Sequence, residues 1–394
     1  MNEKYTYNFN PEIIGLLRNI YKDRTTDILN SITTPTPLYT LRINTLKTDA
    51  DEVLDLLKKE GLEFRKYEYK GLKFHEIIYY KIDSLRKEIK IYNKKIYVDK
   101  FTGESLCQGA NLYRPGILKY EKFSENEILT AIAVINNLEI PVANLQTVIG
   151  SKEMRDMKKG LVAKNIEPIY QGISIHDLEV FKKGYVYDQS LPAILTSIIL
   201  HPENDDFIID MCAAPGGKTT HIAQLLKNKG QILAIDRSNK KIETIKNNLK
   251  RLDVKNVELL KMDSTKLEGY EADKILIDPP CSALGFRPKL ADFTTKQDVL
   301  NFSRFQRQFI NASMKNIKSK GYIVYSTCTL TLEENEWNIE YMIKKFGCKL
   351  VKQSIFIGHP GIKITKEDNM ELCQRFSPVD HLTPGFFIAK LQVP

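Results

Sequence analysis

The sequence predicts an α/β protein: a doubly wound, mostly parallel sheet in the C-terminal half, preceded by a small α+β region and a β-barrel-like domain. From about residue 173 onward, apolar strand-like runs alternate with segments of helical spacing, which is typical of a sheet with helices on both faces. Residues 91–172 instead hold short β-type runs separated by Gly, Pro and Asn. Because 394 residues exceed the usual size of one hydrophobic core, we expect three domains, at 1–90, 91–172 and 173–394.

The first two regions are built from short elements. Residues 11–21 and 50–61 have apolar positions at helical spacing, the second closed by a glycine, and residues 40–43 read as a strand. In the second region the β-type runs are IYV, ILKY, AIAVI, TVIG and LVAK. Together they predict an α+β unit followed by a compact barrel.

The C-terminal half alternates strands and helices. Strands are expected at 207–211, 231–236, 257–263, 274–278, 322–327 and 386–391. Helices are expected from a glycine turn to about residue 227, and at 240–252, 299–317 and 333–345. Parallel strands joined in this way bring their carboxyl ends to one edge of the sheet, where such folds build their sites.

The composition excludes several classes of protein. Hydrophobic and charged residues make up 42% and 27% of the chain, as in ordinary globular proteins. The apolar run at 191–200 is far shorter than the ~18 residues of a membrane span, and the N-terminus lacks the pattern of a secretory signal. We therefore expect a cytoplasmic protein with no membrane association, and nothing in the sequence demands more than a monomer.

Charge and cysteine content give weaker indications. The net charge of +9, with basic residues concentrated at 81–100 and 151–164, modestly favours a polyanionic partner. The six cysteines include no C-x-x-C pair, so we expect no metal site. In a reducing compartment they form no disulfide framework, and each is either a small buried hydrophobe or a reactive thiol.

A small-residue turn between the first strand and first helix of the doubly wound domain predicts a ligand site. The segment IIDMCAAPGGKTTHIA lets backbone approach a ligand at a helix N-terminus. GGKTT also resembles the end of a nucleoside triphosphatase loop, G-x-x-x-x-G-K-[ST], but Cys212 stands where the first glycine is required. The triphosphatase thus remains the weaker alternative.

Two acidic residues favour a nucleoside ligand. Asp236 ends the second strand, 19 residues after Gly217, where carboxylates meet ribose hydroxyls in dinucleotide-type folds. Asp263 ends the third strand, in a position to reach a base edge. A single Asp at a strand end is usually a turn or helix cap, but two in succession after a glycine turn fit S-adenosylmethionine.

Two thiols follow the next two strands. Cys281 lies in DPPCS and Cys328 in STCT, and neighbouring strands would bring them to one pocket although they are 47 positions apart. A thiolate that adds to carbon 6 of cytosine makes carbon 5 nucleophilic enough to accept a methyl group. Asp278 is placed to stabilise the intermediate at the base edge. The sequence pattern alone does not choose between the two cysteines as nucleophile.

The segments CAAPGGKT, DPPCS, STCT, QRFSP and PGFFIAKL, in this order, resemble the Nop/Sun family of RNA cytosine-C5 methyltransferases, with a Rossmann-like catalytic domain. The resemblance implies that Cys328 is the nucleophile and that Cys281 aids product release. It also implies a cofactor site for S-adenosylmethionine that comprises Cys212, Ala213, Ala214, Pro215, Gly216, Gly217, Lys218, Asp236, Asp263 and Asp278.

The upstream region narrows the expected substrate. GESLCQGANLYRPGI resembles the signature of a PUA RNA-binding domain, behind an RRM-like N-terminal region. This order resembles the archaeal and eukaryotic subgroup that methylates cytosine 72 in the tRNA acceptor stem, so tRNA, gripped at its CCA end, is the implied partner. An rRNA methyltransferase with the same chemistry remains an alternative. The expected RNA contacts are Gly109, Ala110, Tyr113, Arg114 and Gly116, with Arg287 as a further candidate for a phosphate or an acidic partner.

Overall fold

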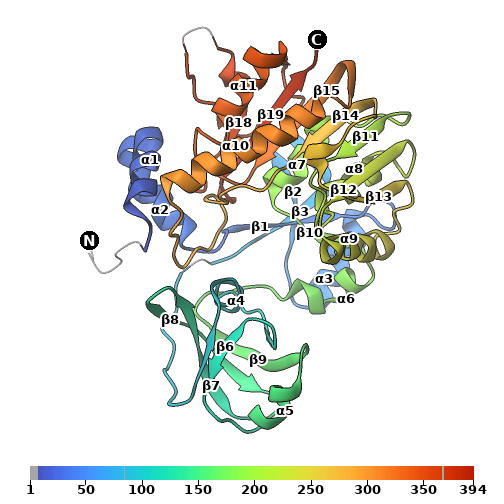
Figure 1. The fold of residues 1–394 in the computed structure, drawn as a ribbon. Helices are drawn as coiled ribbons and strands as arrows, with labels where there is room; N and C mark the ends of the chain where they lie inside the picture. Colours follow the sequence, from blue (N-terminus) through green and yellow to red (C-terminus); the bar gives the residue numbers. More distant parts are fainter. Residues whose placement is uncertain (1–7, 84, 366–367) are drawn as a thin grey trace.

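The computed structural model describes residues 8–83, 85–365 and 368–394, and these residues form three β-sheets (Figure 1). The largest sheet occupies the upper part of the molecule in this view. The smallest sheet lies beside it, and the third forms a separate barrel-like body below.

The smallest sheet has four antiparallel strands in the order β10-β1-β3-β2. Helix α3 (Ala50–Lys59) covers it and begins at Asp49, whose side chain accepts hydrogen bonds from two backbone N–H groups. Its apolar face packs on the sheet together with α6 (Glu179–Lys182) and the 3-10 helix η2 (Ile175–Asp177). The strands are β1 (Leu38–Ile43), β2 (Arg65–Tyr69), β3 (Leu72–Lys81) and β10 (Val186–Asp188).

The second sheet has six strands in the order β5-β9-β8-β7-β4-β6. Its interior is a closed apolar cluster that also takes in α4 (Lys100–Leu106) and α5 (Ser151–Asp156). Strand β8 begins well before the predicted run TVIG, because it pairs with β7 from Leu138 through Pro141 to Gln146. The strands are β4 (Lys95–Val98), β5 (Leu112–Tyr113), β6 (Ile117–Tyr120), β7 (Ile128–Ile135), β8 (Leu138–Thr147) and β9 (Leu161–Pro168).

The third sheet is the doubly wound one. Its order is β13-β12-β11-β14-β15-β19-β18-β17, with β16 also paired to β19. The first five of these strands are parallel, and β19 returns antiparallel. The strands are β11 (Phe207–Asp210), β12 (Gln231–Asp236), β13 (Val257–Lys261), β14 (Ala272–Ile277), β15 (Ile317–Thr327), β16 (Lys349–Leu350), β17 (His359–Pro360), β18 (Gln374–Phe376) and β19 (Phe386–Gln392).

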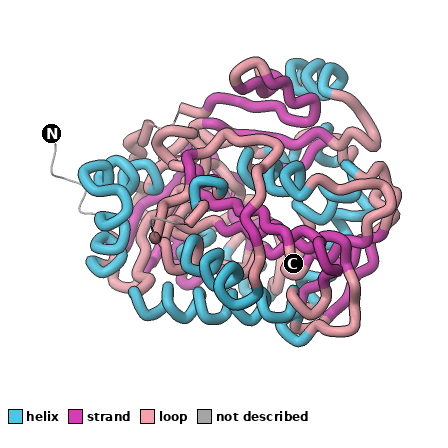
Figure 2. Tube along the Cα trace, turned by 90° about the horizontal axis from the view of Figure 1, so that it is seen from above, coloured by secondary structure: helices cyan, strands magenta, loops and turns pink. Residues whose placement is uncertain are grey.

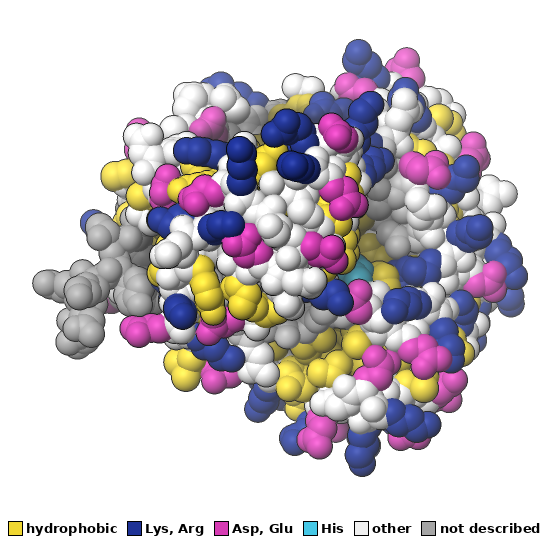
Figure 3. Space-filling model, turned by 90° about the horizontal axis from the view of Figure 1, so that it is seen from below, with side chains coloured by type: hydrophobic (Ala, Val, Ile, Leu, Met, Phe, Trp, Pro, Cys, Tyr) yellow, Lys and Arg dark blue, Asp and Glu magenta, His cyan; other side chains and the backbone are white. Residues whose placement is uncertain are grey.

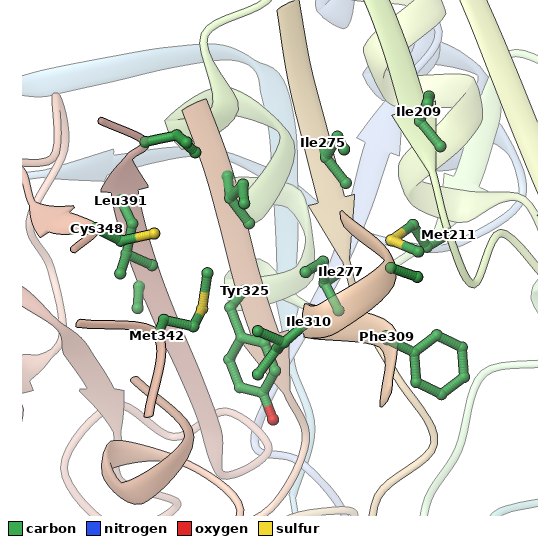
Figure 4. Packing of buried hydrophobic residues seen from close by; sticks show 14 of the residues in the cluster. Ile209, Met211, Ile275, Ile277, Phe309, Ile310, Tyr325, Met342, Cys348 and Leu391 are labelled. Atoms are coloured by element: carbon green, nitrogen blue, oxygen red, sulfur yellow. The ribbon is translucent and has the colours of Figure 1, made fainter. Parts of the chain in front are cut away.

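Helices cover both faces of this sheet, as Figure 2 shows from above. Alternate strand residues point to opposite faces, so Ile209 and Ile275 join one core and Ile208 and Leu276 the other. The first face packs against α10 (Lys296–Ser313), which begins with a capping box at Thr295, and against α11 (Glu336–Phe346). Figure 4 shows Ile310 of α10 beside Tyr325 and Ile277, with Met342 and Phe309 to either side. The second face packs against α7 (Leu191–Leu200) and α8 (Gly217–Leu225), and α9 (Asn239–Arg251) lies over β12 and β13.

The predicted doubly wound fold, barrel-like domain and N-terminal α+β region are therefore confirmed, and β14 and β15 are neighbours as expected. The packing crosses the ranges predicted for the domains. Helices α1 (Pro11–Tyr21) and α2 (Thr25–Ile32) pack on Leu284, Val299 and Leu330 of the C-terminal region. Strand β10, which lies beyond residue 172, completes the N-terminal sheet. In the described part of the chain, no helix is both long and apolar enough to span a membrane.

Candidate active site

The candidate active site lies where the parallel strands of the large sheet end. A cleft of about 270 Å³ opens there, which we call the cofactor cleft. Most of the predicted chemical residues face it, which agrees with the rule that ligands bind at the carboxyl edge of such sheets. Its lining is Met211, Cys212, Ala214, Asp236, Arg237, Lys241, Met262, Asp263, Ser264, Asp278, Pro279, Pro280, Cys281, Ala283, Phe305, Phe309 and Cys328.

The turn after β11 forms one wall of this cleft. Gly216 has a φ of 104°, a backbone conformation that favours glycine, and it starts α8. The Pro215 carbonyl accepts a hydrogen bond from the Asn248 side-chain amide at 2.9 Å, which fixes the turn against α9. Gly217 and Lys218, the first residues of α8, line a cleft that adjoins this one, and the N–H groups of a helix N-terminus suit the carboxylate of a bound amino-acid group.

Behind the turn, two buried groups hold α8 in place. The Asp210 carboxylate accepts hydrogen bonds from the Thr219 hydroxyl at 2.7 Å and from the Cys212 N–H at 3.3 Å. Burial raises the pKa of Asp210 to about 6. From the N-terminal sheet, Arg42 donates to the Gly217 carbonyl at 2.6 Å and to the Thr220 hydroxyl at 2.9 Å. The small sheet thus helps to shape the cofactor cleft.

Asp236 and Asp263 lie in the same cleft at the ends of β12 and β13. One Asp236 oxygen accepts the Ser238 N–H at 3.1 Å, and the other lies 3.4 Å from the Lys241 ammonium. Asp263 also caps the 3-10 helix η3 (Ser264–Lys266), and the hydrogen bonds from Thr265 lower its pKa. Asp263 therefore serves as a helix cap and still presents its carboxylate to the cleft.

The two thiols meet in the cleft. The Sγ atoms of Cys281 and Cys328 are 3.4 Å apart, one after β14 and one after β15. The hydrogen bond from the Cys281 thiol lowers the pKa of Cys328, and the same bond raises the pKa of Cys281 well above that of a free thiol. Since a thiolate is the reactive form of cysteine, a hydrogen bond in this direction favours Cys328 as the nucleophile, and that role stays a prediction.

Asp278 and Lys218 form an ion pair beside the thiols. The Lys218 Nζ lies 2.6 Å from Asp278 Oδ2, and the Ser326 hydroxyl donates to Asp278 Oδ1 at 2.7 Å. Lys218 also lowers the pKa of Cys328 through its positive charge. Because its ammonium is paired with Asp278, Lys218 does not extend along a phosphate-binding loop, as the triphosphatase alternative would require.

A second cleft of about 230 Å³ adjoins the first and shares Cys212, Ala214 and Asp278 with it. We call it the side cleft. It is lined by Tyr187, Asp188, Gln189, Ser190, Ala193, Asp210, Cys212, Ala213, Ala214, Pro215, Gly217, Lys218 and Asp278. Asp278 therefore lies between the two clefts, and Lys218 reaches it from the side cleft.

A buried carboxylate connects the two cysteine loops. Glu334 accepts hydrogen bonds from the Ser282 N–H at 3.0 Å, from the Ser282 hydroxyl, and from the Gln306 amide at 2.8 Å. The Thr331 hydroxyl lies 3.2 Å from the same carboxylate. Burial raises the pKa of Glu334 even though these bonds oppose the shift. The network fixes the residue after Cys281 against the segment after Cys328.

Of the residues predicted to contact RNA in the barrel-like domain, one is exposed on the surface and the others stabilise or shape the loop. Tyr113 exposes 51% of its surface, and Arg114 donates to the Met154 carbonyl at 3.2 Å from a half-buried position. Gly109 and Gly116 have φ angles of 95° and 94°, and a Cβ on Gly116 would lie 1.9 Å from the Thr102 hydroxyl. The glycines therefore shape the loop that presents Ala110 and Tyr113, and their RNA contacts stay predictions.

Arg287 is a correction. It was expected to reach a phosphate or an acidic partner, but it is only 5% exposed. Its guanidinium donates to the Thr34 carbonyl, the Thr34 hydroxyl and the Pro378 carbonyl, each at 2.9 Å. A guanidinium that satisfies backbone carbonyls from two distant segments is a structural anchor and has no donor geometry open to RNA.

Sequence reasoning missed Arg42, Asp210 and Glu334. Asp210 carries a readable signal, because it ends an apolar strand just before the small-residue turn. The other two carry none, since their partners are 175 and 52 positions away along the chain. Only the tertiary structure shows that these charged side chains support the site.

Comparison with known families covers most of the chain. Residues 197–392 match the 16S rRNA methyltransferase RsmB/F family. Residues 94–169 match the PUA domain, and residues 13–76 match the ferredoxin-like domain of RsmF/B-like methyltransferases.

Individual proteins match over the full length. The chain is 42% identical to the tRNA (cytosine(72)-C(5))-methyltransferase of Pyrococcus horikoshii, with 100% of this chain and 99% of that protein covered. It is 29% identical to human NSUN6, also named a tRNA (cytosine(72)-C(5))-methyltransferase, over 94% of this chain and 86% of that protein. A crystal structure of NSun6 from Pyrococcus horikoshii with SFG superposes with a TM-score of 0.87 at 42% identity and covers 99% of both chains.

The cofactor cleft fits the group that this family uses. Its carboxylates after β12 and β13 suit ribose and amino groups, Met211, Met262 and Phe309 supply an apolar wall for a base, and the α8 N-terminus suits a carboxylate. Geometry and comparison agree. The chain belongs to the Nop/Sun family of S-adenosylmethionine-dependent RNA cytosine-C5 methyltransferases, in the subgroup that carries a PUA domain.

Proposed function

We propose that this enzyme methylates carbon 5 of a tRNA cytosine, at position 72 of the acceptor stem, as the named relatives do. The observation that carries the chemistry is the pair of thiols 3.4 Å apart in the cofactor cleft. The substrate follows from the similarity over the full chain and from the PUA domain beside the catalytic domain.

In the proposed reaction the Cys328 thiolate attacks carbon 6 of the cytosine, and a Sγ–C6 bond forms. The electron pair of the 5,6 double bond moves onto the ring, which makes carbon 5 nucleophilic. The Cys281 hydrogen bond and the Lys218 charge favour the thiolate form of Cys328 before the attack. Bound S-adenosylmethionine supplies the methyl group that carbon 5 takes up.

Product release needs a base and a leaving thiolate. In our proposal Cys281 removes the carbon 5 proton and acts as a thiolate in this step. The electron pair of that C–H bond re-forms the double bond, and the Sγ–C6 bond breaks. The pKa of Cys281 is raised, so it starts as a thiol; it loses that proton to solvent before it accepts the carbon 5 proton, and Cys328 departs as a thiolate. Asp278, held by Lys218 and Ser326, would hydrogen-bond the N3 and amino edge of the cytosine.

We place the methyl donor in the cofactor cleft and the cytosine in the part of the same cleft that Cys281 and Cys328 line, next to Asp278. Asp236 and Asp263 would hold the nucleoside part of the donor, and the turn from Cys212 to Lys218 its amino-acid part. Asp278 lines both clefts and its ion-pair partner Lys218 lines the side cleft, so the pair would contact the base as well as the donor. The CCA end would lie along the PUA loop with Tyr113 available for stacking.

The underside of the molecule, where the PUA domain lies, carries many Lys and Arg side chains interleaved with acidic ones (Figure 3). Such a mixed surface suits contacts to a few phosphates of a folded RNA end more than a long basic track. We propose that the enzyme acts as a monomer in the cytoplasm.

The test is bisulfite sequencing of tRNA and rRNA after incubation with the enzyme and S-adenosylmethionine. We expect one new 5-methylcytosine, at position 72 of tRNA. Methylation confined to rRNA would contradict the proposed substrate and favour the rRNA alternative.

The same RNA tests the roles of the thiols. Cys328→Ala should abolish methyl transfer, whereas Cys281→Ala should accumulate a covalent protein–RNA adduct that survives denaturing electrophoresis. Cys348→Ala is the matched control, because this thiol lies in the hydrophobic core on one face of the large sheet. An adduct with Cys328→Ala in place of Cys281→Ala would reverse the assignment.

A further inference from the structure

The loop after Cys281, residues 282–292, is held at almost every position. Ser282 is fixed by Glu334, and Leu284 is fully buried in the cluster under α1 and α2. The Gly285 N–H donates to the Cys328 carbonyl at 2.9 Å, and the Gly285 carbonyl accepts from the Gly385 N–H at 2.8 Å. A Cβ on Gly285 would lie 2.1 Å from the Gly385 carbonyl oxygen, so the two backbones are in contact.

The far side of the loop is held as firmly. Arg287 is anchored to Thr34 and Pro378, as described above. The Lys289 N–H donates to the Ile32 carbonyl at 2.7 Å, and the Leu290 N–H donates to Glu104 of the PUA domain at 3.1 Å. The loop therefore joins the catalytic strand ends to the N-terminal helices and to the PUA domain.

Phe286 is the exception in this loop. It lies between Gly285 and Arg287, yet 51% of its surface is exposed. Its N–H donates to the Ala283 carbonyl at 3.0 Å, in a turn where Ala283 has a φ of 53°, a conformation that L residues rarely adopt. A strained turn, fixed by contacts on both of its sides, thus exposes the Phe286 ring to solvent. The neighbouring residue, Gly285, makes the backbone hydrogen bond to Cys328.

Exposed apolar residues are common on protein surfaces, but Phe286 differs from them because of its place in the chain close to Cys281. Among the large exposed hydrophobic side chains of the described residues, Phe286 is the one that follows a cleft thiol within five positions. Ala283 lines the cofactor cleft and Phe286 does not. Phe286 therefore lies three residues from the lining of the cofactor cleft and outside that lining.

A cytosine in an acceptor stem must leave its base pair before it can enter the cleft, which costs unstacking and unpairing energy. We propose that Phe286 contacts the RNA next to the target cytosine and stacks on the base surface that is exposed when the cytosine leaves the helix. Aromatic stacking is strong and tolerant of base identity, so one fixed ring serves this purpose. This inference rests on the proposed function, since it assumes a paired target.

The test compares two tRNA substrates, one with the target cytosine paired and one with its partner base changed so that the cytosine is unpaired. With Phe286→Ala, we expect kcat/KM for methyl transfer to fall about 10- to 100-fold on the paired substrate, the range that loss of one stacked base gives. On the unpaired substrate the loss should be several-fold smaller. Phe286→Trp should retain most of the activity, and S-adenosylmethionine affinity, measured by calorimetry, should not change.

Phe293→Ala is the matched control, since Phe293 is a phenylalanine of similar exposure, 42%, a few residues further along. It should behave as the wild type on both substrates. Unchanged activity of Phe286→Ala on the paired substrate overturns the proposal. So does an equal loss on both substrates together with weaker cofactor binding, which would indicate a structural role.

Activity of the wild-type enzyme on tRNA distinguishes a failure of the Phe286 proposal from a failure of the proposed function. If the wild type methylates no tRNA cytosine, the substrate assignment is wrong. If it methylates tRNA and Phe286→Ala shows no preference for the unpaired substrate, only the role of Phe286 is wrong. A 2-aminopurine probe at the target position adds a direct measure: its fluorescence should rise on binding to the wild type and rise less with Phe286→Ala, and an equal rise overturns the proposal.

Discussion

Replacing Arg42 by methionine removes the guanidinium that joins the N-terminal sheet to the cofactor loop. Arg42 is 1% exposed and makes three hydrogen bonds, to Gln189 Oε1 at 3.0 Å, to the Gly217 carbonyl at 2.6 Å and to the Thr220 hydroxyl at 2.9 Å. It also lies over the Tyr187 ring, 5.1 Å from its centre. Burial lowers the pKa of Arg42 to about 9, so the side chain stays protonated at neutral pH.

The expected effect is a balance of two terms. Hydrogen bonds from a charged donor contribute about 1.5–3 kcal/mol each, so the three bonds sum to more than about 4 kcal/mol. Against this stands the cost of burying a guanidinium, several kcal/mol, which methionine does not incur. We expect the free energy of unfolding to fall by about 2–4 kcal/mol. S-adenosylmethionine should also bind more weakly, because the Gly217 carbonyl loses its donor and the turn before Lys218 relaxes.

Fluorescence of Trp337, the only tryptophan, reports unfolding of the catalytic domain in urea. Arg24→Met is the matched control, since Arg24 forms an exposed ion pair with Asp380 and should contribute less than about 1 kcal/mol. Calorimetric titration of S-adenosylmethionine gives the second measurement. Equal losses of unfolding free energy in the two variants, or unchanged cofactor affinity in Arg42→Met, would refute the reasoning.

Two further predictions concern titration. Alkylation of Cys328 by iodoacetamide, measured by peptide mass spectrometry without RNA, should rise with pH at a midpoint below that of an ordinary thiol. Cys281→Ala should move this midpoint upward, because the hydrogen-bond donor to the thiolate is lost. An unchanged midpoint would show that the two thiols are not coupled. Asp210 has a folded pKa of about 6 against an ordinary value of 3.8, so its stabilising contribution is complete below about pH 4 and is lost as the pH rises through 6. Between pH 4 and pH 7 the wild type should therefore lose about 2 kcal/mol more unfolding free energy than Asp210→Asn, at about 1.4 kcal/mol per pKa unit. Parallel pH dependences of the two proteins in urea titrations would contradict this.

Local sequence determined most of the elements and one half of the site. The predicted strand 231–236 coincides with β12, and the predicted helix 11–21 with α1, because apolar spacing and capping residues act within a few positions of each other. The cofactor turn could be located for the same reason, since Asp210 to Lys218 are contiguous. Even the meeting of Cys281 and Cys328 was predictable, because parallel strands β14 and β15 must end at one edge of the sheet.

Packing between segments distant along the chain decided the rest. The helix expected at 299–317 ends at Ser313 because β15 begins at Ile317, where pairing with β14 overrides the helical spacing. Arg287 was expected at the RNA, but carbonyls from two other segments bury it.

The sequence by itself determined that this chain has a doubly wound domain with two thiols and three carboxylates at one sheet edge, since these follow from short-range patterns and strand direction. The tertiary structure was needed to show that the two thiols are coupled, which charged groups are anchors, and that Phe286 is exposed three residues after Ala283 of the cleft lining. Those properties depend on desolvation and on contacts between groups many positions apart, which no local pattern encodes.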